Sequence, residues 1–190
     1  MNVYDFDHTI YRGDSTADFY FFCLRRHPMI LSCIPKQVSG AARYKMGKIT
    51  KTQFKEQFYS FFPLIHPIEQ EIQAFWDAHE KKIGDWYRKQ QKEDDCVISA
   101  SPEILLSEIC ARLGNHYLIA SVVDRNGRYQ GENCRGEEKV KRFYKEFPDG
   151  VIHQFYSDSA SDRYLAEIAE QSFLVKRGII RPWTDNTNAD

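Results

Sequence analysis

The chain alternates between short apolar runs and longer amphipathic stretches. Apolar runs with few charges fall at residues 2–6, 96–99, 117–123, 151–156 and 172–175, and each has the length of a buried strand. Amphipathic stretches at 102–113, 137–147 and 162–170 lie between the later runs and predict helices. Strands that alternate with helices predict a parallel, Rossmann-like α/β sheet with helices on both faces. An Asn-Gly turn at 126–127 predicts a hairpin after the third strand.

Between the first and second predicted strands the sequence has no strand pattern. A capping signal at Ser15 predicts a helix, and amphipathic helical spacing continues from Lys36 to about Gln91. The apolar run 29–34 between these stretches is expected to end at Pro35. The segment is too long for a crossover helix. It therefore predicts an all-helical cap, residues 16–91, inserted into a catalytic core made of residues 1–15 and 92–190.

The composition is that of a globular protein. Hydrophobic residues make up 42% of the chain, enough for a core, and the formal net charge is −1. A nucleic-acid binder usually has a basic excess, so this balance argues against one. The longest apolar run, 19–24, is too short to span a membrane. Five cysteines with no CxxC pair, and no secretory signal, indicate reduced thiols and a cytoplasmic protein.

Polar side chains follow the ends of the predicted strands. They are Asp5, Asp7 and Thr9 after the first strand, Ser99 and Ser101 after the second, Lys139 in the 137–147 helix, and Asp158 and Asp162 after the fourth strand. Ligands of an open parallel sheet bind beyond the carboxyl ends of its strands, so these groups are expected to converge. Carboxylates in one crevice repel one another unless a cation lies between them, and Mg²⁺ prefers oxygen ligands. The pattern predicts a Mg²⁺ site that takes a phosphorylated substrate.

These residue types suit phosphoryl transfer. A carboxylate can attack phosphorus and form an aspartyl-phosphate, and a second carboxyl two residues on can protonate the leaving alcohol. A lysine and a hydroxyl can hold the phosphate oxygens. Each residue taken alone also has a structural interpretation, because Asp often forms the turn after a strand and Ser often caps a helix.

The same residues resemble the motifs of a known family, the haloacid dehalogenase superfamily of aspartate-nucleophile phosphatases. Residues 5–9, Asp-Phe-Asp-His-Thr, are similar to its first motif, Asp-x-Asp-x-Thr, and the apolar strand ending at Ser99 is similar to the second. Lys139 matches the third motif, and Asp158 with Asp162 matches the fourth, Asp-x-x-x-Asp. The four motifs occur in the family's order and span nearly the whole chain. The insertion after the first motif resembles the cap of the phosphoserine-phosphatase-like branch.

The resemblance implies catalytic roles for the matched residues. Asp5 is the implied nucleophile, and Asp7 is the implied acid and base, which also offers its main-chain carbonyl to Mg²⁺. Ser99 and Lys139 are expected to bind the phosphoryl group. Asp158 and Asp5 are expected to ligate Mg²⁺.

Supporting roles are implied for further positions. Thr9 and Ser101 are expected in the shell around the substrate, and Asp162 is expected to support the metal site or the lysine. Asp14 aligns roughly with an acidic residue that contacts the substrate amine in phosphoserine phosphatases. His8 departs from the motif, where glycine is commonest. It is expected to have a positional role, since Mg²⁺ avoids imidazole.

The substrate implied by resemblance is not unique. Residues 14–28, 136–140 and 156–159 look like the phosphatidylglycerophosphatase C family, which removes a phosphate from a lipid headgroup, so a lipid headgroup and a small phosphorylated molecule are both expected partners. The apolar segment 19–34 either rests on the inner face of the membrane, binds an acyl chain, or packs the cap against the core or a second subunit. Phosphotransfer to an alcohol other than water, and a catalytically silent phosphate-binding module, remain alternatives.

Overall fold

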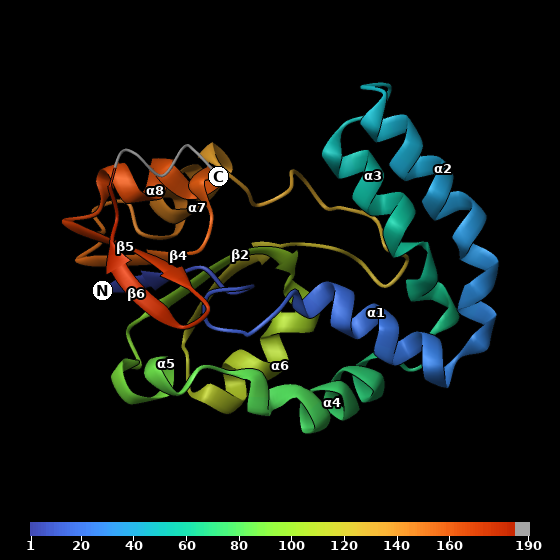
Figure 1. The fold of residues 1–190 in the computed structure, drawn as a ribbon, viewed down its shortest axis with the longest axis horizontal. Coiled ribbons are helices and arrows are strands. Elements are labelled where there is room, and N and C mark those ends of the chain that lie inside the picture. The colour runs from blue at the N-terminus through green and yellow to red at the C-terminus, as the bar shows by residue number, and fades with distance from the viewer. Residues whose placement is uncertain (185–190) are drawn as a thin grey trace.

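The computed structural model describes residues 1–184 and contains a six-stranded sheet in the order β3-β2-β1-β4-β5-β6 (Figure 1). The strands are β1 (Asn2–Tyr4), β2 (Cys96–Pro102), β3 (Tyr117–Ser121), β4 (Gln154–Ser157), β5 (Gln171–Lys176) and β6 (Ile179–Pro182). The first five strands pair in parallel, and β6 pairs with β5 in the antiparallel direction. The predicted α/β fold class is confirmed.

Helices cover both faces of this sheet. Those after β2 are α6 (Glu103–Leu113), α7 (Glu137–Glu146), η4 (Ala160–Asp162) and α8 (Arg163–Ile168). Those between β1 and β2 are α1 (Ser15–Arg26), η1 (Pro28–Cys33), α2 (Ile34–Lys45), α3 (Lys51–Phe58), η2 (Tyr59–Leu64), α4 (Ile68–His79), η3 (Glu80–Lys82) and α5 (Asp85–Gln90). In Figure 1, α5 and α6 lie below the sheet and α7 and α8 lie above it.

The central strands are buried on both faces because successive side chains point to opposite sides of a strand. Val3 and Phe155 pack into the core beneath α7 and α8, together with Phe143. Tyr4 and Tyr156 point to the other face, where their rings stack with centroids 4.9 Å apart. This alternation fixes the register of β1 against β4 and therefore the position of the residues that follow both strands.

The segment between β1 and β2 is helical in the structure, without a strand. Helices α1 and α4 contact each other, and the Trp76 indole of α4 donates a hydrogen bond of 2.8 Å to the Leu105 carbonyl of α6. Helices α2 and α3 pack together and project from the body at the right of Figure 1. The division into cap and core remains a proposal, and its last residues, 185–190, lie outside the described part of the chain.

Two local expectations differ from the structure. Pro35 was expected to end the apolar run 29–34, but it does not interrupt the helical structure there. It lies in the first turn of α2, where the missing N–H of proline leaves no hydrogen bond unmade. The Asn-Gly segment forms a turn closed by a 2.9 Å hydrogen bond from Asp124 N to Arg128 O. That turn joins a single bridge between Val123 and Tyr129 rather than a pair of strands.

Strand β6 was not predicted from the sequence. It follows β5 through a two-residue turn in which Arg177 and Gly178 have φ of 52° and 78°. Two positive φ values are typical of the tight turns that join antiparallel strands. Residues 1–184 contain no helix long and apolar enough to cross a bilayer.

Candidate active site

The carboxyl ends of β1, β2 and β4 meet at a cleft of about 410 Å³. Strand β1 pairs with β2 on one side and β4 on the other, so the chain leaves it at the point where the strand order reverses. Eight of the nine residues singled out in the sequence line this cleft: Asp5, Asp7, Asp14, Ser99, Ser101, Lys139, Asp158 and Asp162. The ninth, Thr9, lies beside the cleft, and its hydroxyl donates a hydrogen bond of 3.4 Å to Asp5. The expected convergence is therefore observed.

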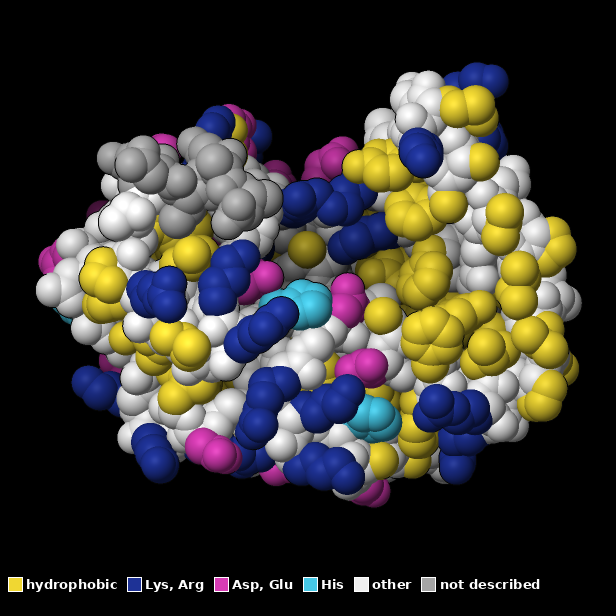
Figure 2. Space-filling model, in the orientation of Figure 1, with side chains coloured by type: hydrophobic (Ala, Val, Ile, Leu, Met, Phe, Trp, Pro, Cys, Tyr) yellow, Lys and Arg dark blue, Asp and Glu magenta, His cyan; other side chains and the backbone are white. Residues whose placement is uncertain are grey.

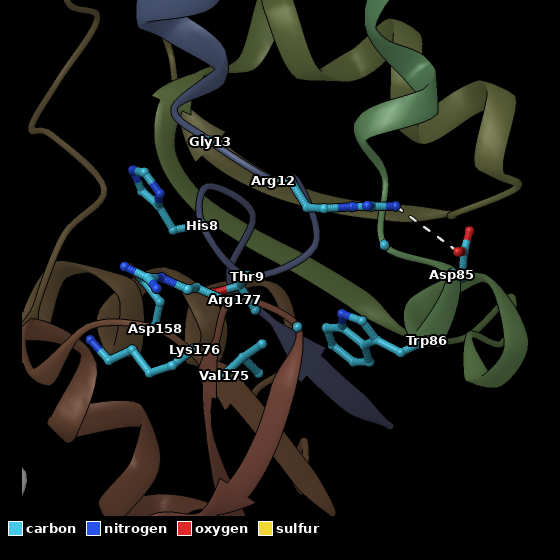
Figure 3. Close-up of a pocket in the computed structure, with 12 residues that line it drawn as sticks. His8, Thr9, Arg12, Gly13, Asp85, Trp86, Asp158, Val175, Lys176 and Arg177 are labelled. Atoms are coloured by element: carbon cyan, nitrogen blue, oxygen red, sulfur yellow. Dashed lines mark ion pairs between the residues drawn. The ribbon is translucent and has the colours of Figure 1, made fainter.

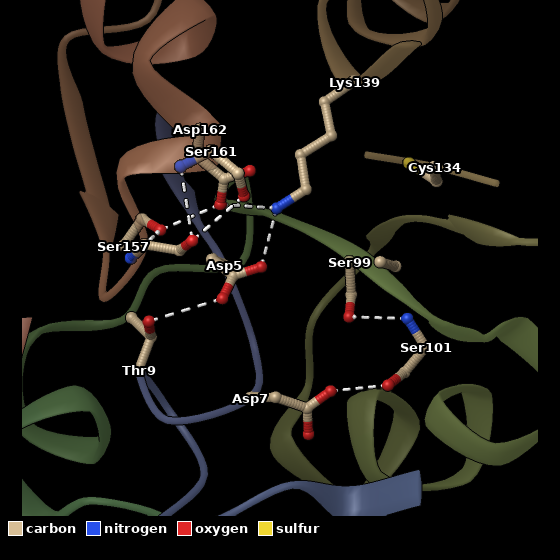
Figure 4. A network of polar contacts seen from close by, with 12 residues as sticks. Asp5, Asp7, Thr9, Ser99, Ser101, Cys134, Lys139, Ser157, Ser161 and Asp162 are labelled. Carbon is tan, nitrogen blue, oxygen red and sulfur yellow. Dashed lines mark hydrogen bonds and ion pairs between the residues drawn. The ribbon is translucent and has the colours of Figure 1, made fainter. Parts of the chain in front are cut away.

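Lys139 forms ion pairs with an aspartate of the first acidic motif and with one of the last (Figure 4). Its ammonium lies 2.6 Å from Asp5 Oδ1 and 2.8 Å from Asp162 Oδ2, and all three side chains are buried. The Ser157 hydroxyl donates to the same Asp162 oxygen at 2.8 Å. The Asp5 amide donates to Tyr156 O at 2.8 Å, which continues the β1–β4 pairing to the carboxylate itself. Asp5 is thus held through both its backbone and its side chain.

Burial and the neighbouring charges have opposite effects on the pKa values of Asp5 and Lys139. Burial raises the pKa of Asp5, and Lys139 opposes the rise by stabilising the carboxylate. Burial alone would lower the pKa of Lys139, but Asp5 and Asp162 outweigh it and raise that pKa above its ordinary value. An ammonium 2.6 Å from a carboxylate oxygen is a charge-assisted contact. We therefore assign Asp5 as ionised and Lys139 as protonated.

Asp7 has a different environment from Asp5. Its carboxyl accepts hydrogen bonds from the Ser101 hydroxyl and from the backbone N–H of Ser15, the latter at 2.6 Å. Burial, followed by the nearby charge of Asp14, raises the pKa of Asp7. A raised pKa favours the protonated form of a carboxyl, which is the form that can donate a proton. The two carboxyls of the first motif thus differ in their partners: a lysine for Asp5, and a hydroxyl and a backbone N–H for Asp7.

Ser99 is brought to the cleft by an irregular strand end. Strand β2 keeps its register with β3 as far as Ile98, and the register then shifts before Pro102. The Ser99 hydroxyl lies in this shifted segment and accepts a hydrogen bond of 3.1 Å from Ser101 N. Such irregularities re-aim side chains beside functional sites. The sequence predicted the strand only to residue 99, because the pattern does not reveal the shift.

His8 lies between the cleft and a second cavity of about 680 Å³ (Figure 3). Its φ of 59° is in the left-handed region, which explains why glycine suits this position of the motif. Asp158 also borders both cavities, and Lys176 and Arg177 line the second one. Burial raises the pKa of Asp158, and His8 opposes that rise.

The oxygen donors of the cleft fit Mg²⁺. Asp5 and Asp158 offer carboxylates there, and Asp7 lines the same cavity. Within residues 1–184 no three side chains of His, Cys, Asp or Glu are placed so that they alone could hold a metal. That arrangement does not suit Zn²⁺, which takes three or four side-chain ligands. It suits Mg²⁺, which takes one or two carboxylates and fills its shell with other oxygens.

Sequence reasoning missed the side of the cleft that α3 forms. Lys51, Phe54, Lys55 and Phe58 of α3 line it, as does Arg135 from the loop before α7. The lysines are four residues apart, so they share one helix face. Charges at that spacing are usually solvent-exposed, and the sequence held no sign that this face turns toward Asp5.

Comparisons with known proteins agree with this geometry. Residues 3–167 match the family model for haloacid dehalogenase-like hydrolase. The chain is 25% identical over 200 residues to Protein CicA of Caulobacter vibrioides (strain NA1000 / CB15N), a match that covers 93% of this chain and 86% of that protein.

Two solved structures are similar to the chain in fold. A protein of unknown function from Bordetella pertussis Tohama I has a TM-score of 0.75 at 21% identity, covering 90% of this chain and 87% of its own. A phosphoserine phosphohydrolase-like protein from Francisella tularensis subsp. tularensis SCHU S4 has a TM-score of 0.55 at 16% identity, covering 90% and 86%.

Proposed function

The chain belongs to the haloacid dehalogenase-like hydrolases, and we propose that it hydrolyses a phosphate monoester through a covalent intermediate on Asp5. The observation that carries this proposal is the setting of Asp5, ion-paired with Lys139 at 2.6 Å in the cleft that Ser99 also lines. The similarity of fold to a phosphoserine phosphohydrolase-like protein supports the same chemistry.

The proposed reaction has two steps. In the first, a carboxylate oxygen of Asp5 bonds to phosphorus, the ester P–O bond breaks, and Asp7 gives its proton to the departing alcohol oxygen. In the second, Asp7 takes a proton from water, the water oxygen bonds to phosphorus, and the P–O bond to Asp5 breaks to release phosphate. Lys139 and Ser99 bind the phosphoryl oxygens. The raised pKa of Asp7 suits the proton donor.

We assign the Mg²⁺ site to the carboxylates of Asp5 and Asp158 and the main-chain carbonyl of Asp7. When bound there, Mg²⁺ would offset the negative charge shared by these carboxylates and the phosphoryl group. Asp162 acts through Lys139, which it contacts at 2.8 Å, and it therefore positions the lysine. Thr9 and Ser101 orient Asp5 and Asp7 in the same way through their hydrogen bonds.

For the substrate we propose a lipid phosphate reached at a membrane surface, with residues 16–91 as the cap. Residues 19–55 contain eight Lys and Arg and no Asp or Glu. Large hydrophobic side chains exposed in this segment are Phe21, Met29, Leu31, Ile34, Val38, Tyr44 and Met46. Figure 2 shows hydrophobic side chains over the half of the molecule formed by α1, α2 and α3. Exposed apolar groups among basic ones suit an anionic bilayer surface.

The test is phosphate release with Mg²⁺ from lipid phosphates in mixed micelles and from soluble esters, phosphoserine included. Asp5→Asn should abolish release. The control is Asp94→Asn, which changes an exposed aspartate just before β2, at the opposite end of that strand from Ser99, and it should not affect release. Chelation of Mg²⁺ should stop turnover, and added Mg²⁺ should restore it. Full activity of Asp5→Asn would falsify the covalent mechanism.

The same assay separates the alternatives. Faster turnover of phosphoserine than of any lipid phosphate would contradict the lipid proposal and favour Asp14, which lines the cleft, as the contact for a substrate amine. Transfer of the phosphoryl group to added glycerol in preference to water would identify a phosphotransferase. Tight binding of a phosphate ester without turnover by the intact protein would indicate a binding module.

A further inference from the structure

Three cationic side chains face the catalytic cleft from outside the phosphoryl-binding group. Lys51 and Lys55 extend from one face of α3, and Arg135 comes from the loop before α7. Lys51 and Arg135 also line the adjoining surface hollow near Ser161. In Figure 2, Lys and Arg side chains gather in the notch between the two halves of the molecule.

None of these three cations forms an ion pair with a carboxylate within residues 1–184. The Lys55 ammonium donates to two neutral oxygens, Ala100 O at 2.7 Å and Asn133 Oδ1 at 2.9 Å. An ammonium has three donors, so Lys55 has one more to offer. Ala100 lies between Ser99 and Ser101, which brings this donor close to the phosphoryl site.

The cations also act on one another. Burial, and then the charge of Lys51, lowers the pKa of Lys55 to about 8. Burial and Arg135 lower the pKa of Lys51. Asp7 and then Asp14 oppose the pKa shift of Lys55, and Asp14 opposes that of Lys51. The Asp14 carboxylate also caps α1 by accepting from Ala17 N at 2.8 Å. A group of like charges that repel one another in this way is stabilised when an anion binds between them.

We infer that Lys51, Lys55 and Arg135 form a second anion subsite, which binds a further anionic group carried by the alcohol portion of the substrate. This inference rests on the proposed function, since it places the ester phosphate at Asp5. The required chemistry is a phosphate, phosphodiester or carboxylate a few atoms from the ester oxygen. Phe54 and Phe58, which lie on the same side of the cleft, would contact the carbon atoms beyond that group.

The test compares three short esters: propyl phosphate, 1,3-propanediol bisphosphate and 3-phosphooxypropanoate. Each has the same ester, and the last two add a phosphate or a carboxylate to the leaving group. The wild-type protein with Mg²⁺ should favour at least one anionic ester in kcat/KM by about tenfold or more, as expected for hydrogen bonds to a charged group. Lys55→Met and Arg135→Met should remove that preference, because they lower kcat/KM for the anionic ester by about tenfold more than for propyl phosphate. Lys141→Met, at an exposed lysine of α7, should keep it.

Comparison of the two anionic esters identifies the group that the subsite binds. A higher kcat/KM for the bisphosphate indicates a phosphate, and a higher kcat/KM for 3-phosphooxypropanoate indicates a carboxylate. Equal kcat/KM for all three esters in the wild type, or an unchanged preference in both variants, overturns the subsite. Failure to hydrolyse any ester instead contradicts the proposed function. In that event calorimetric titration of the Asp5→Asn protein decides the subsite: tighter binding of an anionic ester than of propyl phosphate, lost in Lys55→Met, supports it, and equal affinities overturn it.

Discussion

Lys139 neutralises two buried carboxylates at once, so its charge serves stability as well as chemistry. Its side chain is 2% exposed, and its ammonium contacts both Asp5 and Asp162. Removing one partner from a buried ionic group leaves charge without compensation, which is much more costly than losing a surface ion pair.

We expect Lys139→Met, without metal, to lower the free energy of unfolding by about 3–5 kcal/mol, measured by urea denaturation. The deficit should be smaller at about pH 5 than at about pH 8, because without the ammonium the Asp5 carboxyl binds a proton more readily in the folded state. Lys141→Met on the same helix is the control. A loss of less than about 1 kcal/mol at both pH values would contradict the assignment of an ionised Asp5 paired with a protonated Lys139.

His8 allows a separate test of the backbone of the motif loop. His8→Ala and His8→Gly remove the same imidazole, but only glycine adopts a φ of 59° without steric cost. The glycine variant should therefore be more stable than the alanine variant by about 1 kcal/mol in urea denaturation. Equal stabilities would mean that the loop relaxes to another conformation in solution.

Lys55 makes the anion subsite sensitive to pH. Because the pKa of its ammonium is lowered to about 8, the folded protein loses this charge as the pH rises through that value. The preference in kcat/KM for an anionic ester should be full below about pH 8 and decline above it, since kcat/KM reports the free protein. Lys55→Arg is the control, because a guanidinium stays protonated over this range. A preference in the wild type that does not vary across this range contradicts the prediction.

The site residues differ in how far the sequence could reveal them. Asp5, Asp7 and Thr9 form one contiguous motif at a strand end, so the rule for parallel sheets was enough to place them. Lys139 was placed by resemblance to the family, since a lysine on a charged helix usually faces solvent. Lys55 could not be found in either way, because only the packing of α3 against the β2 end turns it inward.

At the scale of secondary-structure elements, the sequence was enough to predict the buried strands, but not the turn that joins β5 to β6. The apolar runs of β1 and β4 reflect burial on both faces, which their composition records directly. Strand β6 was missed because all of its residues are exposed and its two isoleucines are adjacent, so it has no alternation of apolar and polar residues. It exists through pairing with β5 across the Arg177–Gly178 turn, which is a property of the backbone.

Helix α3 has no buried residue, so its position depends on its ends and contacts. Thr50 Oγ1 accepts from Gln53 N at 3.2 Å, and Gln53 Oε1 accepts from Thr50 N at 2.9 Å, which forms a capping box. We expect Thr50→Ala to lower stability by about 1 kcal/mol in urea denaturation and to raise KM for the preferred ester, because Lys51 and Lys55 lose order with the helix start. Thr50→Ser keeps the acceptor and should preserve both values. A stability loss without any change in KM would separate α3 from substrate binding.

At the scale of the whole molecule, the charge is unevenly divided. The net charge is −1, yet residues 19–55 carry eight of the 26 Lys and Arg and none of the 27 Asp and Glu. The rest of the chain is therefore acidic. A molecule with this division would approach an anionic surface with α1, α2 and α3 first. The mouth of the catalytic cleft lies beside α3, so this orientation would also bring the cleft to the surface.

This orientation predicts binding to vesicles that contain an anionic phospholipid, measured by co-sedimentation, with weaker binding as the salt concentration rises. Arg43 and Lys45 are exposed on α2, and reversing both to Glu should weaken binding more than tenfold, since each basic residue near such a surface contributes about 1 kcal/mol. Reversing Lys141 and Lys145, exposed on α7 of the acidic part, changes net charge equally and should have little effect. Equal losses from the two pairs would mean that net charge alone drives association. No binding to anionic vesicles at low salt would leave the exposed apolar residues of this segment to contact another protein, and would contradict the membrane orientation.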